Sequence, residues 1–128
     1  MVVNTLTPEL MEQGKKLLQE LDASSVKVDS ALWFYFSEQG SWKLMLSIPD
    51  VEKEGPKAGY ETIQRALSKL GEGEAPSLDD IAIARPDAPL LRLLKVAIRT
   101  GPGISGIRFS NNVINGQLIP DAYIYRLT

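Results

Sequence analysis

The chain has 128 residues, of which 44% are hydrophobic and 23% charged, with a net charge of −2 and neither cysteine nor histidine. This length and composition predict one globular domain spanning residues 1–128, and the missing residue types exclude disulfides, thiol nucleophiles, histidine bases and Cys/His metal ligands. The apolar runs fall far short of the roughly 20 residues that span a bilayer, and no signal-peptide pattern opens the chain, so we expect a cytoplasmic protein, prokaryotic in style.

The charges are unevenly distributed along the chain. Residues 1–80 carry 8 Lys/Arg against 14 Asp/Glu, whereas residues 81–128 carry 6 against 2. Such asymmetry indicates either an anion-binding face or two parts of one fold that neutralise each other.

The first expected elements are a helix and a hairpin. Thr7 and Pro8 are typical of a helix start, and this helix is expected to end near residues 22–25. Residues 31–36 and 42–48 then form two strands around a turn at 38–41, with Tyr35 opposite Leu44. Both faces of the hairpin are largely apolar, so it is either covered on both sides or leaves one face for a partner. We expect an interface to use aromatic and methionine side chains, namely Phe34, Phe36, Met45, Tyr123 and Tyr125.

The middle of the chain predicts two further helices and a strand. Pro49 ends the hairpin, an acidic loop follows at 50–55, and a helix runs from Pro56 to a closing Gly71. A short strand is expected at 80–85. Asp87 is the expected cap of a third, mostly buried helix, whose only polar stripe is Arg92, Lys95 and Arg99.

The tail predicts a second hairpin. Asn115-Gly116 is the two-residue turn signal, because both positions tolerate positive φ, and it pairs Ile114 with Gln117. Pro120 lacks an N–H and must face an edge or a bulge. Strict alternation predicts a core face of Ile107, Phe109, Val113, Leu118, Ala122 and Ile124. The fold class is therefore α+β: a mixed, mainly antiparallel sheet of about five strands with three helices, in the order α-β-β-α-β-α-β-β.

The segment 101–106 matches the glycine pattern G-x-G-x-x-G. It follows an expected helix and precedes a strand, the reverse of a dinucleotide-binding motif, so a helix end followed by a tight loop is the favoured interpretation. The alternative is an anion, nucleotide or nucleic-acid site in the basic segment 85–108, with backbone N–H groups of the loop beside arginines. Its candidate residues are Arg92, Arg99, Gly101, Gly103, Ser105, Gly106 and Arg108.

The carboxylates suggest a third hypothesis, a metal- or carboxylate-dependent hydrolase using Asp79, Asp80 or Asp121. No complete catalytic constellation is present, so we assign no catalytic residue, metal ligand or cofactor. The leading hypothesis is a small non-catalytic binding or regulatory protein that acts through protein contacts, including self-association as a homodimer. Nucleic acid is less favoured as a partner because the net charge is −2, and no membrane partner is expected.

Overall fold

The computed structural model describes residues 3–128, apart from the side chain of residue 52. In this part of the chain the elements follow one another in the order α1 (Pro8–Ala23), β1 (Ser30–Phe36), β2 (Ser41–Ser47), α2 (Pro49–Glu52), α3 (Pro56–Ser68), the 3₁₀ helix η1 (Leu78–Asp80), β3 (Ile81–Ile83), α4 (Pro89–Ala97), β4 (Ile107–Ile114) and β5 (Gln117–Leu127).

The five strands form one mixed sheet in the order β3-β2-β1-β5-β4. All neighbouring pairs are antiparallel except β2 and β3, which run parallel. The α+β class and the element order expected from the sequence are therefore confirmed. The sequence did not predict the four-residue helix α2, which occupies part of the expected acidic loop, or the turn of 3₁₀ helix before β3.

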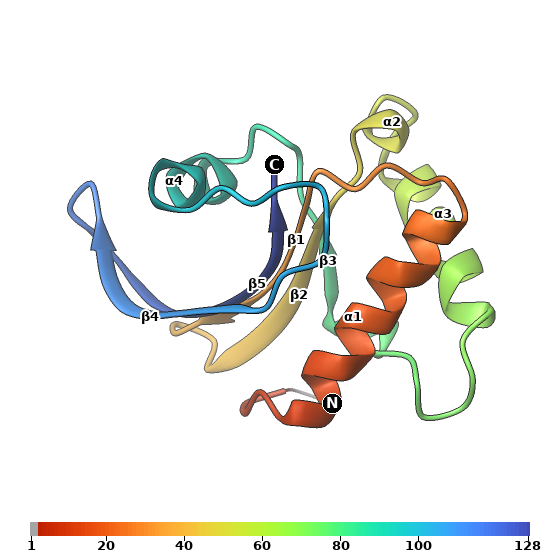
Figure 1. Cartoon of the computed structure of the whole chain (residues 1–128), viewed down its shortest axis with the longest axis horizontal. Coiled ribbons are helices and arrows are strands. Elements are labelled where there is room, and N and C mark those ends of the chain that lie inside the picture. The colour runs from red at the N-terminus through yellow and green to blue at the C-terminus, as the bar shows by residue number, and fades with distance from the viewer. Residues whose placement is uncertain (1–2) are drawn as a thin grey trace.

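Helices cover both faces of the sheet. The sheet curves strongly, with α4 on its concave side and α1 and α3 on the other side (Figure 1). One core cluster lies under α1 and α3 around Trp33 and Tyr125, and a second lies under α4 around Leu32 and Ile124. Burying each such side chain contributes about 1.5–3 kcal/mol, so both layers are held to the sheet mainly by apolar packing.

The β1–β2 hairpin has the predicted faces but not the predicted register. Trp33 pairs with Leu44, and Tyr35 pairs with Trp42, two residues from its expected partner. The connection occupies 37–40 and ends at Gly40, whose φ of 63° lies in the left-handed region, so β2 begins at Ser41. A shift of two residues keeps the alternation, because side chains repeat every two positions along a strand.

The helix ends show where local signals succeed. The Oγ1 of Thr7 accepts a hydrogen bond from the Leu10 N–H at 3.2 Å, which confirms the predicted cap of α1. The predicted cap of α4 is wrong, because Ala88 is at the N-cap position and Asp87 instead accepts a hydrogen bond from Arg85 at 3.2 Å. The glycine-rich loop does not close α4 either, since the helix ends at Ala97 and passes into extended backbone.

The β4–β5 hairpin has the predicted register, with Ile114 opposite Gln117. Its alternation, however, inverts halfway along. Asn111 has φ of 49° and lies opposite Pro120, and the ladder skips this position. Beyond it, Ile114 and Ile119 point into the cluster under α4, whereas Val113 and Leu118 are 65% and 62% exposed. The prediction that these last two residues belong to the core is therefore wrong.

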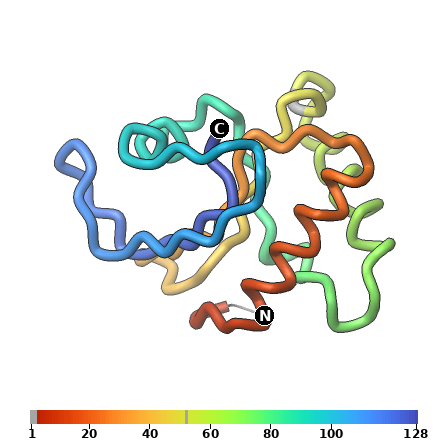
Figure 2. The backbone as a smooth tube through the Cα atoms, viewed as in Figure 1, coloured from red at the N-terminus to blue at the C-terminus, as the bar shows by residue number. Residues whose placement is uncertain are grey.

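Figure 2 shows the path of the backbone through this region, where the tip of the β4–β5 hairpin rises beside α4. In residues 3–128, no helix combines the length and the apolar composition that crossing a membrane requires.

Candidate functional site

The helix α4 is apolar around much of its circumference, and the chain covers it only in part. Leu91 and Leu94 are fully buried against the sheet. Leu90 and Leu93 are partly exposed, and Val96 is 64% exposed. A surface helix ordinarily presents charged and polar residues to solvent, so the exposure of Val96 beside the half-buried Leu90 and Leu93 is unusual.

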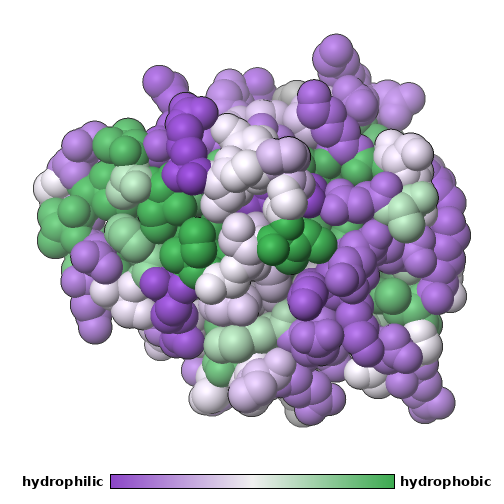
Figure 3. Space-filling model, in the orientation of Figure 1, coloured by the Kyte–Doolittle hydropathy of each residue, from purple (hydrophilic) through white to green (hydrophobic). Residues whose placement is uncertain are grey.

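The tip of the β4–β5 hairpin adds more apolar surface. Val113 and Leu118 are directly paired across the two strands and both are exposed because of the inversion at Asn111. We call Leu90, Leu93 and Val96, with the edge of the hairpin at Gln117, the α4–hairpin surface. Val113 and Leu118 alternate with Ile114 and Ile119 and therefore lie on the other face of the hairpin. Hydrophobic residues gather on this side of the molecule in Figure 3, where Figure 1 places α4 and the hairpin.

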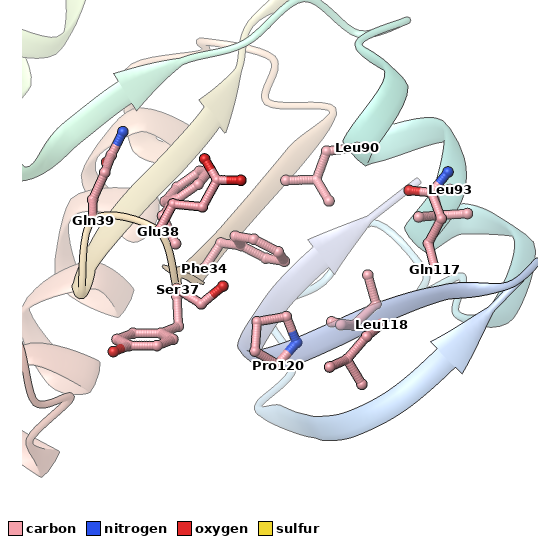
Figure 4. A pocket seen from close by; sticks show the side chains of 12 residues that line it. Phe34, Ser37, Glu38, Gln39, Leu90, Leu93, Gln117, Leu118 and Pro120 are labelled. Atoms are coloured by element: carbon pink, nitrogen blue, oxygen red, sulfur yellow. The ribbon is translucent and has the colours of Figure 1, made fainter.

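A cavity opens beside this surface where two strands separate. Strands β1 and β5 pair only as far as Phe34 and Ala122. Pro120 follows on the open side, and it has no N–H with which to continue the ladder. The resulting gap measures about 320 Å³, and α4 closes it through Leu90 and Leu93 (Figure 4). The prediction that Pro120 faces an interruption of the sheet is thus confirmed.

The cavity continues along α4 toward the hairpin tip. A second hollow of about 490 Å³ shares Leu90, Leu93 and Gln117 with the first and extends to Val96. Among the described residues that line the two hollows, the charged ones are Glu38 and Arg92. A groove of this kind binds apolar side chains, with amide groups such as that of Gln117 at its edge to orient them.

The interface residues expected from the sequence are only partly at this groove. Phe34 and Phe36 line the cavity, with their rings in edge-to-face contact at 4.9 Å. Met45 is buried under α4, and Tyr125 is buried under α1. Tyr123 is partly buried and packs edge-to-face on Tyr125 at 5.3 Å. The hairpin faces are therefore covered within the chain, which is the first of the two alternatives that the sequence left open.

Sequence reasoning missed the residues that are exposed. The signal for Leu90, Leu93 and Val96 was present, because a helix with only a narrow polar stripe needs cover on several sides. The sequence analysis took this narrow polar stripe to mean that the rest of the helix is buried within the chain. The structure supplies that cover fully at Leu91 and Leu94, in part at Leu90 and Leu93, and hardly at Val96.

The expected anion-binding residues do not gather at one place. Arg92 lines the hollow beside α4, whereas Arg99 and Gly101 line another hollow at the far end of the sheet. Ser105 and Gly106 line a third, against α1. Gly103 lies in the exposed part of the loop. Arg108 is held by Asp121 in a two-pronged ion pair with distances of 2.7 and 2.6 Å, and its guanidinium lies 5.4 Å from the centre of the Trp42 ring.

The hollow at Arg99 contains a buried arginine that the sequence analysis did not single out. Arg126 is 4% exposed, and its guanidinium binds both carboxylate oxygens of Asp22 at 3.0 and 2.8 Å. It also donates to the carbonyl groups of Val28 and Gly103. The hollow measures about 590 Å³, and Lys27 lies on its wall together with Arg99. The sequence does hint at a buried role for Arg126, because it is a lone cation at the end of an otherwise apolar strand.

The three carboxylates of the hydrolase hypothesis have different surroundings and do not form one site. Asp79 is exposed, and Asp80 is buried, where desolvation raises the pKa of its carboxyl although Lys43 opposes the shift. Hydrogen bonds from Arg108, followed by that from Ser110, hold the pKa of Asp121 below its usual value against the opposing effect of burial. Within the described residues, no three acidic side chains come together as a metal site would require.

Comparisons with known proteins give no significant match, whether with family models, curated proteins or solved structures.

Proposed function

We propose that this protein is a non-catalytic binding module that works through a protein contact at the α4–hairpin surface and its groove. The observation that carries the proposal is the exposure of Val96 beside a hollow lined by the half-buried Leu90 and Leu93, on a helix whose Leu91 and Leu94 are already fully buried. Exposed apolar side chains beside an apolar groove are typical of protein-binding sites, because association removes them from water.

The surroundings of the groove support a protein partner over a small charged ligand. Its walls are leucine, phenylalanine and isoleucine side chains with a few amides, and only Glu38 and Arg92 contribute charge. Interfaces between proteins have this composition, an apolar centre with a polar margin.

Site-directed photo-cross-linking in the cells that produce the protein would test this proposal. A benzophenone amino acid at position 96 should give a discrete adduct, because that side chain would lie inside the contact. The matched control is the same replacement at Gln64, an exposed position on α3. Equal labelling at both positions, or none at position 96, contradicts the proposal.

A second candidate function is the binding of a small anion in the hollow lined by Lys27 and Arg99. The observation that favours it is the size of that hollow, about 590 Å³, with two exposed cations on its wall and Arg126 already neutralised by Asp22. Calorimetric titration with inorganic phosphate tests it. Binding should weaken in Lys27→Ala and Arg99→Ala and remain in Arg92→Ala, which lies elsewhere; unchanged binding in the first two variants contradicts this site.

A further inference from the structure

Strand β3 is an edge of the sheet, and its outer side carries backbone groups that the sheet does not use. The Ala84 N–H donates to the Leu46 carbonyl at 2.8 Å, so residue 84 directs its backbone groups toward β2. Successive residues of a strand direct these groups to opposite sides, so the N–H and C=O of Ile83 point away from β2. In the part of the chain that the structure describes, no further backbone hydrogen bond reaches Ile83. This residue is therefore available to pair with an added strand.

A cavity of about 390 Å³ lies directly beside this edge, between β3 and the start of α3. Ile83 and Ala84 form one wall, and Val51, Pro56 and Tyr60 contribute to the others. Tyr60 is 38% exposed, so its ring borders the opening to solvent. Figure 1 shows α2 and α3 on the side of the molecule away from β4. Apolar walls of this kind hold an apolar side chain.

Gly59 sets the close spacing between α3 and β3. An added Cβ at this position would lie 2.9 Å from Cδ1 of Ile83 and 3.8 Å from Cγ2 of Val51. Further along the same helix, Ile63 and Ala66 are buried in the core under α1 and α3. The helix and the strand edge are therefore held together by packing, and the cavity between them has walls made of regular secondary structure.

We infer that Ile83 and this cavity, together called the β3 groove, bind an extended peptide segment of another protein. The segment adds a strand to the sheet through the backbone of Ile83 and places one large apolar side chain in the cavity. In this mode of recognition, backbone hydrogen bonds give affinity and the side-chain pocket gives specificity. A compact apolar ligand would fill the cavity but leave the Ile83 N–H and C=O without partners.

The β3 groove is separate from the α4–hairpin surface. The cavity beside β3 shares no described lining residue with the two hollows beside α4. This inference therefore does not depend on the proposed function, and each site has its own test.

The charges around the β3 groove specify the peptide further. Among the described residues that line the cavity, Arg85 is the charged one. Its pair with Asp87 is exposed on both sides, so water weakens it and an acidic peptide residue can compete for the guanidinium. Lys57 is exposed in the first turn of α3, which contains no acidic residue. We therefore expect an acidic residue next to the apolar anchor of the peptide.

The length of β3 limits the strength of binding. The strand has three residues and is followed two positions later by Pro86. A short edge protects a sheet from indiscriminate strand pairing, so the side chain in the cavity must supply the selectivity. We expect reversible binding, with a dissociation constant between about 1 µM and about 1 mM.

Selection from a phage-displayed library of random peptides tests the inference. The library presents about seven random residues, more than the edge can pair with, to the immobilised full chain. We expect enrichment of sequences with one large apolar residue beside an acidic one. The enriched peptide, made synthetically and added to the ¹⁵N-labelled protein, should shift the amide signals of Ile83 and Tyr60 and slow the hydrogen exchange of the Ile83 amide.

Two perturbations separate strand addition from nonspecific adhesion. Tyr60→Ala removes a wall of the cavity and should weaken binding of the enriched peptide about tenfold. The matched control is Gln64→Ala, an exposed position on the same helix that should leave binding unchanged. Methylating single amide nitrogens of the peptide should abolish binding at every second position only, because alternate amides of an added strand face β3.

Four results overturn the inference: no enriched peptide, an enriched peptide that shifts the amides of α4 in place of Ile83, equal binding by Tyr60→Ala and Gln64→Ala, or a methylation effect without a two-residue period. Protection of the Ile83 amide that increases with protein concentration in the absence of peptide would also overturn it, because the added strand would then come from a second copy of this chain.

Discussion

Replacing Gly14 by alanine should destabilise the protein, although the same change in most helices is favourable. Gly14 lies within α1, where alanine is ordinarily more stable by about 1 kcal/mol. Here an added Cβ would lie 2.8 Å from Nε1 of Trp33 and would collide with the hydroxyl of Tyr125. Those two groups share a buried hydrogen bond of 3.1 Å, so the methyl group must push them apart.

The magnitude follows from three contributions. Overpacking of a dense core costs about 1–3 kcal/mol, and weakening the hydrogen bond costs about 1 kcal/mol. The gain in helix propensity offsets about 1 kcal/mol. The net loss is therefore about 1–3 kcal/mol, which lowers the urea midpoint by about 1 M for a slope near 2 kcal/mol per molar.

Two further variants make the assay decisive. Gly101→Ala meets no atom within 4 Å and should be neutral or stabilising by up to about 1 kcal/mol, since Gly101 is not in the left-handed region. Tyr125→Phe removes the colliding hydroxyl, so Gly14→Ala should cost less in that background. A higher midpoint for Gly14→Ala, or the same cost with and without the Tyr125 hydroxyl, would refute this reasoning.

The inverted hairpin and the Arg108–Asp121 ion pair that joins its two strands give three more predictions. Ile119→Ala should lower the free energy of unfolding by about 2–4 kcal/mol and Leu118→Ala by less than about 0.5 kcal/mol, both measured by urea titration; similar losses would contradict the inversion. Asn111→Val should cost about 1–2 kcal/mol because the left-handed conformation disfavours a branched side chain, whereas Asn111→Gly should be tolerated; equal effects would exclude a conformational cause. The hydrogen bonds from Arg108 and Ser110 lower the folded-state pKa of Asp121 below 3.8, so its stabilisation is present above about pH 4 and is lost as pH falls further. Asp121→Asn should therefore flatten the decline in stability below that pH, and an unchanged acid profile would rule out this contribution.

Much of the fold can be predicted from sequence patterns that stay informative even when a local detail, such as a strand register, is predicted wrongly. The faces of the β1–β2 hairpin were predicted although its register was not, because a slip of two residues preserves the alternation. The helix cap at Thr7 and the turn at Asn115-Gly116 could be predicted because each depends only on residues adjacent in the sequence. Asn115 and Gly116 indeed have φ of 50° and 79°. Such local constraints do not require knowledge of the tertiary structure.

Other features depend on contacts that sequence distance conceals. Asn111 inverts the alternation of β4 by adopting a left-handed conformation, and asparagine occupies that region in only a minority of its positions. Asp22 and Arg126 are 104 positions apart, and no local pattern joins them. The pairing of β3 with β2 is likewise a contact across intervening helices, and it is parallel, which two hairpins alone would not suggest.

The candidate site emerges from a mismatch between sequence and structure. The helix expected within 87–99 has only three polar residues in its stripe, all of them cations. Most of its circumference is therefore apolar and must be covered by other parts of the protein or by a partner. The folded chain provides this cover at Leu91 and Leu94 and leaves Val96 in water. Leaving an apolar side chain exposed costs about 1.5–3 kcal/mol relative to its burial. That free energy becomes available on association, so the residues that the fold leaves uncovered are those with most to gain from a partner.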